Sequence, residues 1–287
     1  MFRVFLRVFP VFLVLILFSV ASACSRIVYK TAYRSADSLI LGRIDKYFDL
    51  DSSQENFLSQ RLHEHLVWHK RTEMPRYEIF LSEFRGRVSD GLTSAEVDWL
   101  YANFRTARVD LMNQIKPDTI DFLSTITPEQ ISHLENQFPD LNKELEETVA
   151  LSPSERNEIR YKKLLESASE WAGDLSENQK RRVQEAASRM PDFPPAQLQF
   201  RKIREKEVID LLKSRPGRRE IESKVNLWLV NVEAGYPAEY RRTVDQWNVQ
   251  MKRLILDIDG SLSAEQRRAV VGRIDGFLQD VRDLRSP

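Results

Sequence analysis

The chain has 287 residues, with 43 lysine or arginine and 43 aspartate or glutamate residues, so its formal net charge at neutral pH is zero. This balance argues against a nucleic-acid-binding protein, which would carry a basic excess. Charged residues make up 30% of the chain and glycine occurs only 9 times, a composition that favours helices.

The first residues have the layout of a bacterial-type secretory signal peptide. Arg3 and Arg7 supply a positive start, and a nearly uninterrupted apolar stretch follows from residue 8 to residue 20. Small residues come next and satisfy the rule for signal cleavage between Ala23 and Cys24. A membrane-spanning helix needs about 20 apolar residues, more than the strictly apolar part provides. We therefore predict that residues 1–23 are removed, with an uncleaved anchor as the alternative.

Cys24 is the only cysteine in the chain. It cannot form an internal disulfide, and in an oxidising compartment it would remain a free thiol. The stretch from Ala21 to Cys24 resembles the lipobox of bacterial lipoproteins, which implies acylation of Cys24, with palmitate as a typical chain. Two or more acyl chains anchor a protein stably. Alternatively, Cys24 is unmodified.

Ser25 follows Cys24, at the place where an aspartate tends to retain lipoproteins at the inner membrane. The lipoprotein resemblance therefore implies a location at the periplasmic face of the outer membrane. A soluble periplasmic protein and an inner-membrane-anchored protein are the alternatives.

Capping boxes mark helix starts along the chain. In each box a capping residue stands three positions before a glutamate or glutamine, so that each side chain can bind the other residue's backbone N–H. The boxes are Asp51–Gln54, Thr93–Glu96, Thr127–Gln130, Ser152–Glu155, Ser176–Gln179 and Ser263–Gln266. Apolar residues between the boxes recur at helical spacing, which predicts an all-α, multi-helix bundle of about ten helices.

Proline and glycine mark the expected loops, at residues 116–117, 138–139, 193–195, 216–217 and 259–260. The double proline after Met190-Pro191 is the best candidate for a domain boundary. We therefore predict a lipidated N-terminus and first helix at 24–48, one helical part at 49–190 and a second at 191–287. One continuous domain is the alternative.

Two resemblances follow from these motifs. The lipobox, residues 44–50, Gln54 and residues 68–77 together resemble a family of uncharacterised proteobacterial lipoproteins, which supplies no activity. The box at Leu175–Gln179 is similar to the repeated Leu-Thr-x-x-Gln signature of Spy- and CpxP-type periplasmic chaperones. Leu262–Gln266 and Ile126–Gln130 share that arrangement, which implies a chaperone-like or stress-sensing role.

One polar cluster interrupts an apolar helix face. His65 and His69 lie one turn apart and Glu73 lies one turn further along the same face. Histidines at this spacing can share a metal ion, with Glu73 as a third ligand. The alternatives are buried histidines that form hydrogen bonds with Glu73 or with a carbonyl near Pro75, and a pH-responsive role. His133 could complete a metal site only if the fold brings it near.

Signatures of known enzyme classes are missing from the sequence. It contains no Gly-x-Ser-x-Gly elbow, no glycine-rich phosphate loop and no second thiol. We therefore predict no catalytic residue, no cofactor other than the lipid at Cys24, and no enzymatic activity. The predicted function is a membrane-anchored, helical binding domain for an envelope protein or component. The alternatives are a chaperone-like or stress-sensing protein, and a metal or pH sensor that uses His65 and His69.

Overall fold

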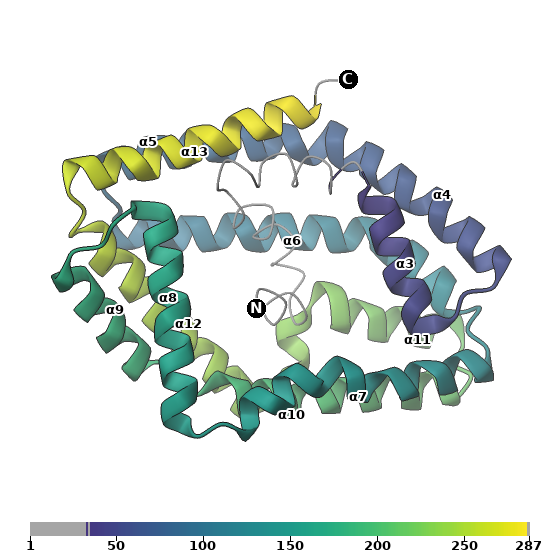
Figure 1. The fold of residues 1–287 in the computed structure, drawn as a ribbon. Coiled ribbons are helices and arrows are strands. Elements are labelled where there is room, and N and C mark those ends of the chain that lie inside the picture. The colour runs from purple at the N-terminus through teal and green to yellow at the C-terminus, as the bar shows by residue number, and fades with distance from the viewer. Residues whose placement is uncertain (1–32, 34, 286–287) are drawn as a thin grey trace. The chain divides into compact units, whose positions relative to one another are not determined.

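The computed structural model describes residue 33 and residues 35–285 (Figure 1). Cys24 and the predicted cleavage site lie outside the described residues. The α-helices are α3 (Ala36–Phe48), α4 (Ser52–Trp68), α5 (Met74–Asp90), α6 (Ser94–Leu123), α7 (Pro128–Ala150), α8 (Pro153–Ala172), α9 (Glu177–Arg189), α10 (Phe193–Lys213), α11 (Arg218–Val225), α12 (Ala238–Asp259) and α13 (Ala264–Arg285).

Two π-helical segments, η2 (His69–Glu73) and η3 (Asn226–Val230), and a 3-10 segment, η4 (Val232–Gly235), complete the secondary structure of this part of the chain. The described residues form no strand, which confirms the predicted all-α fold. Among these helices, none combines the length and the apolar character that crossing a membrane requires.

All six predicted capping boxes form, at the starts of α4, α6, α7, α8, α9 and α13. In the box of α9, the Gln179 N–H donates to Ser176 Oγ at 3.3 Å and the Ser176 N–H donates to Gln179 Oε1 at 2.9 Å. These contacts satisfy backbone donors that the first turn of a helix leaves without an intrahelical acceptor. Local sequence therefore fixes where these helices begin.

The predicted loops at residues 116–117 and 138–139 are wrong, because Pro117 lies inside α6 and Pro139 lies inside α7. A proline in a helix interior removes one backbone hydrogen bond and costs about 3 kcal/mol. Packing of the flanking turns offsets this cost. Ile120 and Phe122, for example, follow Pro117 and are 3% and 6% exposed.

The other predicted loops lie at helix ends. Phe193 begins α10, so the double proline forms its first turn, where a missing N–H removes no intrahelical bond. The predicted loop at 193–195 is therefore the start of a helix. The predicted breaks at 216–217 and 259–260 are confirmed, since α11 begins at Arg218 and α12 ends at Asp259.

Residue contacts divide the described chain into two compact units. Unit 1 contains the described residues up to Met74 together with Phe104–Glu144 and Gln199–Tyr236. Unit 2 contains Pro75–Asn103, Leu145–Leu198 and the described residues from Pro237 onward. Each unit thus combines three separate segments of the chain. The predicted division after residue 190 stays a prediction, because contacts alone do not show which segments fold together.

Unit 1 is packed around α7, α10 and α6. Ile131 and Leu134 of α7 form one buried cluster with Ile209 and Leu212 of α10. A second cluster, Ile120, Ile221 and Val225, fixes α11 against α6. Burial of such side chains stabilises the unit by about 1.5–3 kcal/mol for each of the larger ones.

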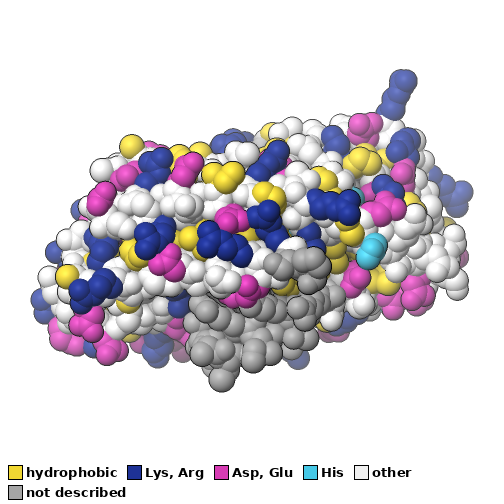
Figure 2. Space-filling model, turned by 90° about the horizontal axis from the view of Figure 1, so that it is seen from above, with side chains coloured by type: hydrophobic (Ala, Val, Ile, Leu, Met, Phe, Trp, Pro, Cys, Tyr) yellow, Lys and Arg dark blue, Asp and Glu magenta, His cyan; other side chains and the backbone are white. Residues whose placement is uncertain are grey.

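Unit 2 is packed around α9. Val183, Ala186 and Met190 form a buried cluster with Leu254 of α12, and apolar side chains of α8 cover it. Val183 is 0% exposed, so this face of α9 lies fully inside the unit. On the face of the chain shown in Figure 2, basic side chains are interspersed with acidic and hydrophobic ones.

Candidate functional site

The predicted polar cluster lies where α4 passes into the π-helical segment η2. The Met74 N–H donates to His69 O, five residues earlier, which defines the wider turn. Pro75 follows immediately and has no N–H, so the α-helical ladder cannot continue through it. Such π-helical turns occur frequently at functional sites, and this one holds two of the three predicted site residues, His69 and Glu73.

His65 is bound by an acidic residue of α6. Its Nε2 atom lies 2.7 Å from Asp118 Oδ2. Arg61 donates from Nε to the other oxygen, Asp118 Oδ1, at 2.8 Å, and its Nη1 lies 2.5 Å from Glu64. Asp118 is only 7% exposed. The carboxylate therefore links two side chains of α4 to α6, and the Arg61 guanidinium compensates the burial of its charge.

His69 has a different partner, Tyr33. The Tyr33 hydroxyl lies 2.9 Å from His69 Nδ1. Burial lowers the pKa of His69 to about 4 and raises the pKa of Tyr33 to about 12. At neutral pH the imidazole is therefore neutral and the phenol keeps its proton. The two neutral groups share one hydrogen bond, and its direction depends on which ring nitrogen of His69 carries the proton.

The three predicted ligands do not converge. Glu73 is 1% exposed and ends η2, while His65 and His69 bind residues from different elements. His133 lies on α7, with Nε2 3.0 Å from Lys46 O. Within the described residues, no group of three or more histidine, cysteine, aspartate or glutamate side chains is placed to hold a metal ion. Metal binding by His65, His69 and Glu73 stays a prediction.

The chemistry of this cluster is that of a polar core. A histidine with a pKa near 4 is a poor general base at neutral pH, and the Asp118 carboxylate binds both Arg61 and His65. The cluster joins α4 to α6 and joins η2 to Tyr33. Its geometry supports helix positioning more directly than it supports catalysis.

The sequence pattern indicates the histidines but not their partners, Asp118, Arg61 and Tyr33. A signal existed for Asp118, because it stands between Ile115 and Phe122 on one side of α6, where an isolated carboxylate requires a buried partner. Because a loop was predicted at Pro117, Asp118 was not assigned to the same helix face as Ile115. No local signal connects Tyr33 to His69, which lies 36 residues further along the chain.

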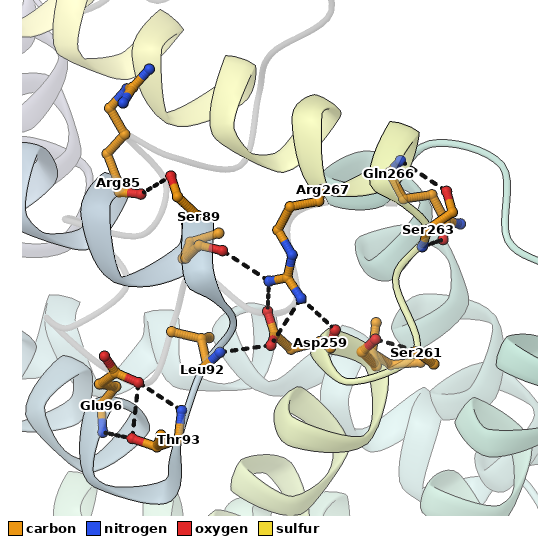
Figure 3. Close-up of polar contacts among 12 residues, drawn as sticks. Arg85, Ser89, Leu92, Thr93, Glu96, Asp259, Ser261, Ser263, Gln266 and Arg267 are labelled. Atoms are coloured by element: carbon orange, nitrogen blue, oxygen red, sulfur yellow. Dashed lines mark hydrogen bonds and ion pairs between the residues drawn. The ribbon is translucent and has the colours of Figure 1, made fainter.

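A second buried polar cluster lies in unit 2, at the end of α12 (Figure 3). Asp259 is 7% exposed and accepts from the Leu92 N–H at 2.7 Å. Its carboxylate also binds the guanidinium of Arg267, on α13. Arg267 in turn donates to Val88 O at 2.9 Å and to Asp259 O at 2.7 Å. This cluster ties the loop between α5 and α6 to the loop between α12 and α13.

The fold and these clusters define an all-helical protein whose buried polar residues join helices that are distant in sequence. The chain belongs to a family of unknown function, DUF6279, which it matches over residues 46–241. The expected membership in an uncharacterised family is thereby confirmed. No curated protein and no solved structure gives a significant match. The proteobacterial, lipoprotein and chaperone resemblances stay predictions.

Burial of neutral His69 predicts acid sensitivity. Its folded pKa of about 4 lies below the usual value, so the unfolded chain binds a proton first as the pH falls. The contribution of neutral, buried His69 to the free energy of unfolding is fully present above about pH 6.5. It is lost as the pH falls towards 4, by up to about 3 kcal/mol. Urea unfolding at about pH 7.5 and about pH 4.5 measures this loss.

A substitution isolates the contribution of His69. His69→Gln removes the titrating group, so it should lose less stability on acidification than the parent chain. His63→Gln, at an exposed position of α4, is the control and should behave like the parent. Equal acid losses in His69→Gln and the parent would contradict the assignment.

Proposed function

We propose that this chain is a lipid-anchored protein of the bacterial envelope whose helical body binds an envelope protein or component without catalysing a reaction. The observation that carries the anchor is the lone Cys24 directly after Ala21-Ser22-Ala23 and an apolar leader. The all-helical body supports the binding role. In the clusters described above, the polar side chains join helices.

The proposed address is the periplasmic face of the outer membrane. Ser25 stands where an inner-membrane retention signal would place aspartate. A lipid on Cys24 would leave the helical body outside the bilayer, tethered by several acyl chains. The body would then meet partners that lie along the membrane surface.

Replacing Cys24 tests the anchor. The parent chain should sediment with membranes and incorporate radiolabelled palmitate, and Cys24→Ser should appear in the soluble periplasmic fraction without label. Ser25→Asp keeps the cysteine and should move the protein to the inner membrane, which separates sorting from acylation. A Cys24→Ser protein that still sediments with membranes would refute the lipid anchor.

Crosslinking in intact cells tests the binding role. The anchored parent should give the same crosslinked envelope partner in repeated experiments, and the soluble Cys24→Ser protein should give less of it, because it is no longer held at the membrane. If the parent yields no reproducible partner, the binding proposal fails while the anchor can still hold.

A chaperone-like role is the second candidate, favoured by the glutamine boxes at the starts of α4, α7, α9 and α13. The soluble Cys24→Ser protein should then suppress aggregation of a heat-unfolded client enzyme at a stoichiometric ratio. Unchanged client aggregation would eliminate this role and leave the binding proposal standing. A pH-sensing role depends on His69 and is tested by the acid titration above.

A further inference from the structure

Two glutamine boxes in unit 1 bind each other. Gln54 Nε2 lies 3.1 Å from Gln130 Oε1, and Gln130 Nε2 lies 2.6 Å from Gln54 Oε1. Each amide also reaches the other loop, since Gln54 Nε2 donates to Thr125 O at 3.3 Å and Gln130 Nε2 donates to Asp49 O at 3.0 Å. We call this reciprocal arrangement a glutamine clasp.

Unit 2 contains the same clasp. Gln179 Nε2 donates to Gln266 Oε1 at 2.9 Å, and Gln266 Nε2 donates to Gln179 Oε1 at 3.0 Å. Gln179 Nε2 also donates to Ser261 O at 3.0 Å, and Gln266 Nε2 donates to Asp174 O at 2.8 Å. As in unit 1, each of these carbonyls lies two residues before the capping residue of the partner box.

A hydroxyl group shows which boxes correspond. Thr125 Oγ1 accepts from Gln54 Nε2 at 3.0 Å and donates to Phe122 O at 2.8 Å. Ser261 Oγ accepts from Gln179 Nε2 at 3.3 Å and donates to Ile258 O at 2.8 Å. The earlier box of unit 1 therefore matches the earlier box of unit 2, and the later box matches the later box.

The reciprocal pair needs side-chain amides, which glutamine supplies. Its amide carries both a donor and an acceptor, so two such groups can satisfy each other. A carboxylate only accepts, and Glu96 and Glu155, which end the other two boxes, cannot form a reciprocal pair. The helix pairs follow the same order. The earlier box of each unit joins two helices that pack on each other, α3 and α4 in unit 1 and α8 and α9 in unit 2. The later box joins α6 to α7 in unit 1 and α12 to α13 in unit 2.

We propose that the chain arose by internal duplication, so that residues 36–150 and residues 153–285 are two copies of one module. Each module contains two helix pairs and is closed by one glutamine clasp. The copies repeat in order along the sequence, and each clasp lies within one unit. The duplication is independent of the proposed anchor and binding role.

The two copies have also exchanged their connecting segments. Residues 75–103 of the first copy belong to unit 2, and residues 199–236 of the second copy belong to unit 1. Within unit 2, Lys252 Nζ lies 2.5 Å from Asp98 Oδ1. Within unit 1, Lys213 Nζ lies 2.7 Å from Glu135 Oε2. Each unit therefore contains residues of both copies, as in a swapped dimer joined into one chain.

Transplanted boxes test the correspondence in the full chain. Residues 51–54 are replaced by Ser-Glu-Asn-Gln, the sequence of 176–179, or by Thr-Ser-Ala-Glu, the sequence of 93–96. The first transplant should keep the Tm within about 2 °C and the second should lower it by about 5 °C or more. Hydrogen exchange should accelerate in the loops before α4 and α7 only in the second. Equal behaviour of both transplants would overturn the equivalence of the boxes.

Zero-length crosslinking tests the exchange. A protease site between Ala150 and Leu151 divides the folded chain at the junction of the copies, and a carbodiimide then joins lysines to carboxylates in contact. Both Lys213–Glu135 and Lys252–Asp98 should form and hold the two fragments together on a denaturing gel. Lys213→Arg and Lys252→Arg should each abolish one crosslink. Absence of either crosslink, when Lys180–Glu177 within one fragment still forms, would overturn the exchange.

Discussion

Glutamate in place of Gln179 is expected to lower the free energy of unfolding by about 3 kcal/mol. Gln179 is 2% exposed, and its Nε2 atom donates to Gln266 Oε1 and to Ser261 O. A carboxylate cannot donate, so the variant places a buried negative charge against both acceptors. Urea unfolding of the parent and of Gln179→Glu at neutral pH measures the loss.

The same substitution carries its own pH signature. Burial among acceptors raises the pKa of the introduced carboxyl group above its unfolded value, so the lost stability returns on acidification as the group takes up a proton. The deficit relative to the parent should shrink as the pH falls towards about 5. Gln184→Glu, at an exposed position of the same helix, is the control and should change stability by less than about 0.5 kcal/mol. A Gln179→Glu deficit no larger than this control would contradict the clasp.

Helix starts were predictable because their determinants are local. A capping residue and a glutamate or glutamine three positions later lie within one turn, and every predicted box forms its contacts. The wrong loop predictions concern two prolines. Pro117 and Pro139 were predicted to mark loops, but packing with segments far away in sequence keeps α6 and α7 continuous.

Local sequence patterns do not predict which boxes bind each other, although the residue that ends each box indicates which boxes can. Four boxes end in glutamine and two end in glutamate, and only the first group can pair reciprocally. Which glutamines meet depends on contacts between residues 76 or more positions apart. The histidines follow the same rule, since Asp118 and Tyr33 reach His65 and His69 from other elements.

Alanine in place of Asp259 is expected to lower the free energy of unfolding by about 4 kcal/mol, because it removes one partner of a buried ion pair. The Leu92 N–H and the Arg267 guanidinium would lose the same acceptor at once. Asp257→Ala is the control on the same helix. That carboxylate is 41% exposed and lies 3.9 Å from Arg253, so its loss should change stability by about 1 kcal/mol or less.

A double variant separates the ion pair from the loop contact. Arg267→Leu alone leaves Asp259 buried without its counter-charge, and in combination with Asp259→Ala neither charge remains. The double variant should therefore be destabilised by at least about 1.5 kcal/mol less than the sum of the two single variants. Strict additivity would mean that the two side chains do not act as a pair. If the two side chains are coupled, the destabilisation that remains in the double variant comes from the Leu92 N–H, because neither alanine nor leucine can accept its hydrogen bond.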